Sequence, residues 1–153
     1  MECCCPEESI TQFKIEVNQI LGRLFSQYYN ITFLSLLDEE GIVVDYHIHS
    51  LNQKSEILKK LEEISKNAVE FKIASMKAAK LLGFNSISET FYRGDSHICV
   101  TYDIDCYFLV IIIEMSKPLV DSFDFEKFNE KIELIIIELR KKIESLKKDD
   151  IDS

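Results

Sequence analysis

The sequence predicts a single α+β domain with the element order α-ββ-α-βββ-α. Apolar residues recur at three- and four-residue spacing in three long segments, five shorter runs are rich in β-branched and aromatic residues, and short polar turns separate those runs. The chain has 153 residues, of which 46% are hydrophobic, which is enough for one core. We therefore expect one domain over residues 9–148, between a flexible cysteine-rich tail at 1–8 and a flexible acidic tail at 149–153.

The predicted helices cover residues 9–29, 54–82 and 122–148. Ser9 and Gln12 fit a capping box, in which both side chains bond the first free amides, so the first helix should begin at Ser9. The second helix contains neither Gly nor Pro, and Gly83 directly after it provides a stop signal. One stripe of the second helix should face the sheet: Ile57, Leu61, Ile64, Ala68, Phe71, Ser75, Ala79 and Leu82.

The predicted strands cover residues 31–37, 42–48, 85–93, 96–104 and 106–113. The turn Asp38-Glu39-Glu40-Gly41 joins the first two strands, and Gly41 can take the positive φ that a tight hairpin needs. The last strand is apolar at consecutive positions. This pattern is typical of a central strand that is covered on both faces.

The composition excludes several classes of function. The formal net charge of −9 disfavours non-specific binding to nucleic acid or to anionic lipid. No apolar run approaches the roughly 20 residues that span a bilayer, and the N-terminus lacks the features of a secretory signal. The four glycines are scattered, so no Walker loop or dinucleotide fingerprint is present, and neither GxSxG nor HExxH occurs. We therefore expect a cytoplasmic protein that is not an enzyme and binds no cofactor or nucleic acid.

The order of elements resembles the roadblock family of dynein light chains and bacterial and archaeal GTPase regulators, which share a longin-like architecture. The residues that carry the resemblance are the leading helix, the hairpin LLDEEGIVVDY, the long helix ending in AAKLLGF and the closing pair ICVTYDIDCYFLVIII, together spanning roughly residues 9–148. The resemblance implies a five-stranded antiparallel sheet in the order 2-1-5-4-3. It also implies that the long second helix covers one face and that the first and last helices cover the other.

The long helix carries more apolar surface than one sheet can cover. At 100° per residue from Ile57, the residues Leu58, Val69, Ile73 and Met76 lie at about 100° to 160°, outside the sheet-facing stripe. These side chains either touch flanking loops or sit singly exposed, or they contact the same helix of a second copy in a two-fold dimer. The resemblance favours the dimer, because members commonly pair the edge of the third strand and the long helices.

The function implied by the resemblance is that of a homodimeric adaptor that binds and regulates or scaffolds a Ras-like small GTPase. By the resemblance, such dimers either stimulate hydrolysis by reshaping the switch regions of the GTPase or act as a scaffold. For an arginine finger only Arg93 lies in a plausible loop position, so a scaffold is favoured over a finger-type activator. The alternatives are a small-molecule-sensing domain of related architecture and a longin-type trafficking or membrane-tethering adaptor. The expected dimer and partner residues are Leu58, Val69, Lys72, Ile73, Met76, Lys77, Lys80, Thr90, Tyr92 and Arg93.

A metal site is the one chemical alternative that the strands offer. Asp45, His47 and His49 alternate along one strand and should point to the same face, where they could offer ligands to zinc. His97 and Cys99 could complete such a site only from a strand that, in the implied order, is about 14 Å away. A solvated or partly covered edge strand is therefore the preferred interpretation, and we expect no metal.

Cys3, Cys4 and Cys5 stand side by side before Pro6. Three adjacent residues cannot easily aim their sulfur atoms at one ion, and a reducing compartment disfavours a disulfide. Lipid attachment to these thiols would make the protein membrane-peripheral. The other interpretation is a tail with no role that the sequence reveals.

Overall fold

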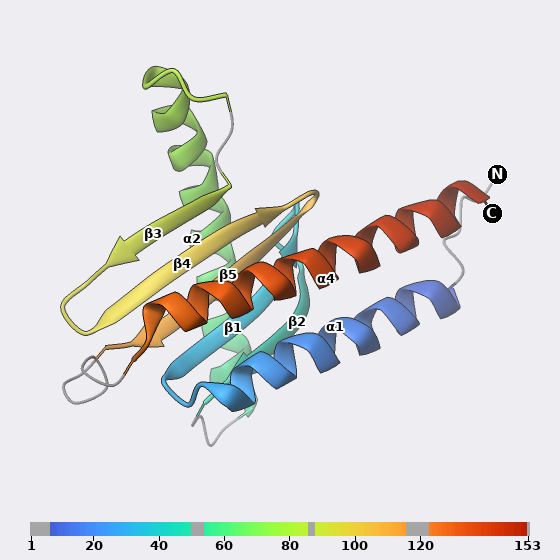
Figure 1. The fold of residues 1–153 in the computed structure, drawn as a ribbon, viewed down its shortest axis with the longest axis horizontal. Coiled ribbons are helices and arrows are strands. Elements are labelled where there is room, and N and C mark those ends of the chain that lie inside the picture. The colour runs from blue at the N-terminus through green and yellow to red at the C-terminus, as the bar shows by residue number, and fades with distance from the viewer. Residues whose placement is uncertain (1–6, 50–53, 86–87, 116–122, 153) are drawn as a thin grey trace.

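The computed structural model describes residues 7–49, 54–85, 88–115 and 123–152, and Figure 1 shows their arrangement. The helices are α1 (Glu7–Gln27), α2 (Lys54–Leu81) and α4 (Phe125–Asp152). The strands are β1 (Ile31–Asp38), β2 (Val43–Ile48), β3 (Glu89–Arg93), β4 (His97–Ile104) and β5 (Tyr107–Glu114). This order confirms the α-ββ-α-βββ-α prediction.

The strands form one antiparallel sheet in the order β2-β1-β5-β4-β3, as expected. The central strand β5 pairs with β1 on one side and with β4 on the other. Its residues Leu109, Val110 and Ile111 are buried, which confirms that the most apolar strand lies in the middle. The two edges of the sheet are β2 and β3.

Helices cover the two faces of the sheet unequally. In Figure 1, α1 and α4 lie together in front of the sheet, and α2 crosses behind it. The core on the α1 and α4 side is large and includes Leu21, Leu34 and Phe128. The core under α2 is smaller, with Leu61 and Ala68 of the helix packed among Phe33, Leu37, Phe108 and Val110 of the sheet.

Two predicted turns are confirmed by their backbone geometry. Gly41 has a φ of 83°, and the Asp38 carboxylate accepts hydrogen bonds from the amides of Glu40 and Ile42 at 2.9 Å, which closes the β1–β2 turn. Gly83 has a φ of 85°, and the Phe84 amide donates to the Ala79 carbonyl at 2.9 Å. This second pattern is the Schellman ending that a glycine after a helix favours.

The predicted helix ends are wrong at several positions. Helix α1 already includes Glu7, so Ser9 does not cap it, and Gln12 donates instead to Glu16 one turn later. Helix α4 begins at Phe125, where the Asp124 carboxylate accepts from the amide of Lys127, and it continues through Asp152 rather than ending at Lys148. Charged side chains can continue a helix in solvent, so composition alone did not mark its end.

Strand β3 begins at Glu89, later than the predicted start at residue 85, and residues 86–87 lie outside the described ranges. Leu82, expected against the sheet, is 73% exposed just beyond the end of α2. The helix projects past the β3 edge at this point in Figure 1, so no strand lies under it. None of the described helices is both long enough and apolar enough to cross a bilayer.

Gly41 provides a test of the packing between the β1–β2 turn and α2. A Cβ added at Gly41 would lie 2.7 Å from Val69 Cγ2, whereas one added at Gly83 would meet nothing within 4 Å. Both glycines have a positive φ, so Gly83→Ala isolates the backbone strain of about 1 kcal/mol. Gly41→Ala should lower the free energy of unfolding by about 2–3 kcal/mol, measured by urea denaturation. The Val69→Ala change should recover the steric part in a double variant, and equal losses for the two glycines would contradict the contact.

Candidate interaction surface

The C-terminal end of α2 and the residues that follow it expose large apolar side chains. This group, called the overhang, consists of Ile73, Met76, Leu81, Leu82 and Phe84. Ile73 is 50% exposed and Leu81 is 89% exposed, although Ala79 between them is buried. The end of α2 extends past the sheet in Figure 1, whereas Met76 still lies beside Thr90 and Thr101 of the sheet. Ile73 and Met76 are exposed within α2, whereas Leu81, Leu82 and Phe84 are exposed at and beyond its end. Exposed apolar side chains gathered at one end of a molecule are typical of an interaction surface.

Strand β3 borders the overhang and adds aromatic side chains. Tyr92 packs against Phe71 of α2, with ring centroids 3.6 Å apart. Phe91 points to the opposite face, because its partner in the ladder is Val100 of the α1 and α4 core, and it is exposed there. The other side of β3 carries no strand within the described residues, so its ladder is open for pairing.

Lys72 differs from the other lysines that sequence reasoning placed in the partner surface. Its Nζ lies 3.3 Å from the Asp103 carboxylate and 5.3 Å from the centre of the Phe108 ring. Both charged side chains are about three-quarters buried, so the ion pair holds α2 on the sheet. Lys77 and Lys80 are exposed and form none of the ion pairs found among the described residues.

The remaining predicted partner residues differ in how far they are exposed. Val69 is half-buried over the Gly41 turn, Thr90 is half-buried on β3, and Arg93 is exposed at the end of β3. The side chain of Leu58 lies outside the described set, as do Cys3, Cys4 and Cys5. The structure therefore brings Ile73, Met76 and the β3 edge together at one end of the molecule. Lys72 lies beside them, lining a small cavity with Met76 and Thr90, whereas Val69 lies further back on α2 over the β1–β2 turn.

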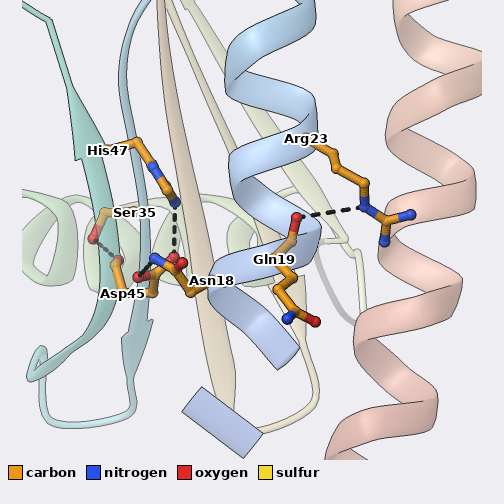
Figure 2. Close-up of polar contacts among 6 residues, drawn as sticks. All are labelled: Asn18, Gln19, Arg23, Ser35, Asp45 and His47. Atoms are coloured by element: carbon orange, nitrogen blue, oxygen red, sulfur yellow. Dashed lines mark hydrogen bonds and ion pairs between the residues drawn. The ribbon is translucent and has the colours of Figure 1, made fainter. Parts of the chain in front are cut away.

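Asp45, His47 and His49 share the face of β2 that contacts α1, as their alternation predicts. Figure 2 shows Asp45 between Asn18, which donates to it at 2.9 Å, and His47, whose Nε2 lies 3.0 Å from the carboxylate. His49 stacks instead on Phe25, with ring centroids 4.2 Å apart. This arrangement is a polar bridge between β2 and α1, and the described residues contain no group of three or more potential ligands positioned for a metal ion.

His97 and Cys99 belong to β4, with β1 and β5 between them and β2. His97 is exposed and contacts Ser96, whereas burial raises the pKa of the Cys99 thiol. On the opposite face, burial and the carboxylates of Glu89 and Glu133 raise the pKa of Tyr102. Raised pKa values keep both groups protonated, which is the unreactive form of a thiol or a phenol.

No protein-family model matches this sequence, and none of the curated proteins is similar enough to count as a match. Solved structures do match over most of the chain. MglB of Myxococcus xanthus is 22% identical, with a TM-score of 0.61 over 87% of this chain and 91% of that one. MglB in a tetrameric arrangement is 15% identical, with a TM-score of 0.69 over 88% of this chain and 92% of that one.

A Roadblock/LC7 domain from Streptomyces avermitilis is 13% identical, with a TM-score of 0.65 over 82% of this chain and 96% of that domain. The chain has the roadblock fold. The roadblock fold accounts for the sheet order and for the division of the helices between the two faces. At these identities the likeness extends to the fold alone, so the roles of individual residues depend on the geometry described above.

Four residues of the exposed apolar surface were missed by the sequence reasoning: Leu81, Leu82, Phe84 and Phe91. Leu81 and Leu82 continue the apolar pattern of the helix, and the sequence does not indicate where the sheet beneath it stops. The dipeptide Leu81-Leu82 directly before the stop residue Gly83 could have indicated an exposed helix end. A helix end that is buried in a core leaves less room for the turn that follows it.

The Lys72–Asp103 pair gives a prediction about stability. Lys72→Met should lower the free energy of unfolding by about 1 kcal/mol, because it removes the charge that pairs with Asp103 and lies over Phe108. Lys77→Met, on the same helix but exposed, is the matched control and should change the free energy of unfolding by less than about 0.5 kcal/mol. Equal effects in urea denaturation would show that Lys72 is an ordinary surface lysine.

Proposed function

We propose that this protein is a homodimeric roadblock-type adaptor that binds a Ras-like small GTPase and regulates or scaffolds it. The observation that carries the proposal is the overhang beside the open β3 edge. The resemblance to GTPase regulators of the roadblock family and the likeness of the fold to MglB support the same class of function.

The dimer would combine two kinds of contact. The open ladder of β3 can pair with β3 of a second copy, and Ile73 and Met76 can pack against their counterparts across a two-fold axis. Both contacts lie at the same end of the molecule, so one isologous interface can include them. Burying the overhang would remove from water the apolar surface that a monomer leaves exposed.

The GTPase would bind near the paired α2 helices. Lys77 and Lys80 are exposed there on a chain whose net charge is −9, so they offer local positive charge to an acidic surface of the partner. Among the arginines, Arg23 pairs with Glu138 at 3.2 Å, Arg140 of α4 lines a cavity with Glu89, and Arg93 belongs to β3 itself. Arg93 is the last residue of a strand, so we favour a scaffold over an arginine-finger activator.

The dimer can be tested by a double charge substitution. Ile73→Glu with Met76→Glu should convert a dimer into a monomer of 17.8 kDa, because two carboxylates per copy would be buried at the interface. Light scattering coupled to size-exclusion chromatography measures the mass. The matched control, Leu134→Glu with Ile137→Glu on the exposed face of α4, should remain a dimer. A wild-type monomer, or a variant of unchanged mass, would contradict the proposed interface.

The partner can be tested by affinity capture from native lysate with and without a non-hydrolysable GTP analogue. The wild-type chain should retain a Ras-like GTPase in one nucleotide state, whereas Lys77→Glu with Lys80→Glu should lose at least about 80% of it by charge repulsion. Lys141→Glu with Lys148→Glu, exposed on α4, makes the same change in net charge away from α2 and should leave capture unchanged. An Arg93→Ala variant should leave GTP hydrolysis by the captured GTPase unchanged if the protein is a scaffold. Capture of no GTPase in either state would refute the proposed partner.

A further inference from the structure

A groove of about 800 Å³ lies between the edge strand β2 and α2, away from the overhang. Apolar side chains line it from both elements, among them Val43 of β2 and Leu61 and Val69 of α2. The groove runs beside Gly41, whose lack of a side chain leaves room for Val69. It is therefore an open apolar channel that follows one edge of the sheet.

The floor of the groove contains a polar group without a partner. Ser65 of α2 lines the groove and is only 6% exposed. Its hydroxyl makes no hydrogen bond to any residue of the described ranges. An unpaired buried hydroxyl destabilises a protein unless something bonds to it. Ser65 thus marks a place where a bound molecule could supply the missing partner.

The edge strand β2 carries only part of the usual protection against pairing. Its sequence, VVDYHI, contains neither Lys nor Pro. Its inward-pointing charge, Asp45, is held by Asn18 and His47, and a register shift lies beside it, so the protection of this edge is confined to that charge and that bulge. By contrast, β3 carries a charged residue at each end, Glu89 and Arg93. On its outer side β2 has no neighbouring strand within the described residues.

The charges around the groove identify the kind of segment that fits. Four acidic residues line it against the single ammonium of Lys66. The Asp45 carboxylate is held by Asn18 and His47, which leaves those of Glu40, Glu62 and Glu70 around the groove. A second copy of β2 would bring the same carboxylates together, so a second copy is disfavoured. The tail at residues 1–6 contains Glu2 and no basic residue, so it does not complement the rim either.

We propose that the β2 edge and its groove bind an extended basic segment of a partner protein, which adds to the sheet as a sixth strand. Backbone hydrogen bonds to β2 would hold the segment, apolar side chains at alternate positions would enter the groove, and lysines or arginines would meet the acidic rim. The segment's polar groups can also bond the Ser65 hydroxyl. This site lies at the opposite edge of the sheet from the proposed dimer interface, so it is independent of the proposed function and would be open at both ends of a dimer.

The test is a titration of the ¹⁵N-labelled full chain, followed by NMR, with an acetylated and amidated heptapeptide of alternating lysine and valine. Amide shifts should be confined to Val43–Ile48 and to residues 61–70 of α2. A heptapeptide of alternating glutamate and valine should not bind, because its charges oppose the rim. A peptide with the same lysines and valines in two separate blocks should bind at least about tenfold more weakly, since it cannot alternate its faces as a strand.

Variants separate the groove from general electrostatic attraction. Glu62→Lys with Glu70→Lys should weaken binding of the alternating lysine peptide about tenfold, whereas Glu130→Lys with Glu144→Lys on α4 carries the same charge change and should leave it within about twofold. Ser65→Ala should raise the melting temperature of the free chain and lower its affinity for the alternating lysine peptide. A serine with a purely structural role would not show both effects.

Four outcomes would overturn the proposal. These are no shifts at millimolar peptide, shifts centred on β3, equal binding of the blocked peptide, and concentration-dependent broadening of β2 resonances without peptide. The last outcome would assign the edge to a second copy of the chain.

Discussion

One helix has to cover a whole face of a five-stranded sheet, and the rest of the structure depends on that constraint. Five strands span about 19 Å between the edge strands, whereas a helix with its side chains is about 10–12 Å wide. Helix α2 therefore crosses the sheet, buries Leu61, Ala68 and Ala79 along its length, and covers each edge strand over only part of its length. The groove between α2 and β2 follows from this incomplete cover, whereas the overhang arises because the end of α2 continues past the sheet.

The opposite face is covered more fully, because two helices share it, although Phe91 at the β3 edge stays exposed there. Helices α1 and α4 run antiparallel, and side chains link them along their length, with Lys131 reaching Gln27, Arg23 reaching Glu138 and Lys142 reaching Glu16. These exposed links contribute little energy individually, and the buried residues Leu21, Phe128 and Leu139 provide the stability of that layer. Helix α1 is also joined to β2 through the Asn18–Asp45–His47 bridge, so the strand is anchored on one face and open on the other.

The fold was predictable because its signals are local and repeat along the chain. Periodic apolar residues placed the helices, Gly41 and Gly83 placed two turns, and the apolar run from Tyr107 placed the central strand. The interaction surface was predictable only in part. Periodicity identified Ile73 and Met76 as turned away from the sheet, but the position of the sheet edge beneath Leu82 depends on the angle at which α2 crosses, which no local pattern contains. The ion pair of Lys72 could not be predicted for a similar reason, since its partner Asp103 is distant in sequence.

The two uncovered edges differ in chemistry, which makes them suited to different partners. At β3 the overhang is apolar and lies beside lysines, whereas the β2 groove is rimmed by Glu40, Glu62 and Glu70 and has an aliphatic floor. A self-complementary contact needs a surface that does not repel itself, and the apolar overhang meets that condition better than the acidic rim. A foreign basic segment needs the reverse, so the distribution of charge along α2 is compatible with the proposed self-association at the β3 edge and with the proposed binding of a basic segment at the β2 edge.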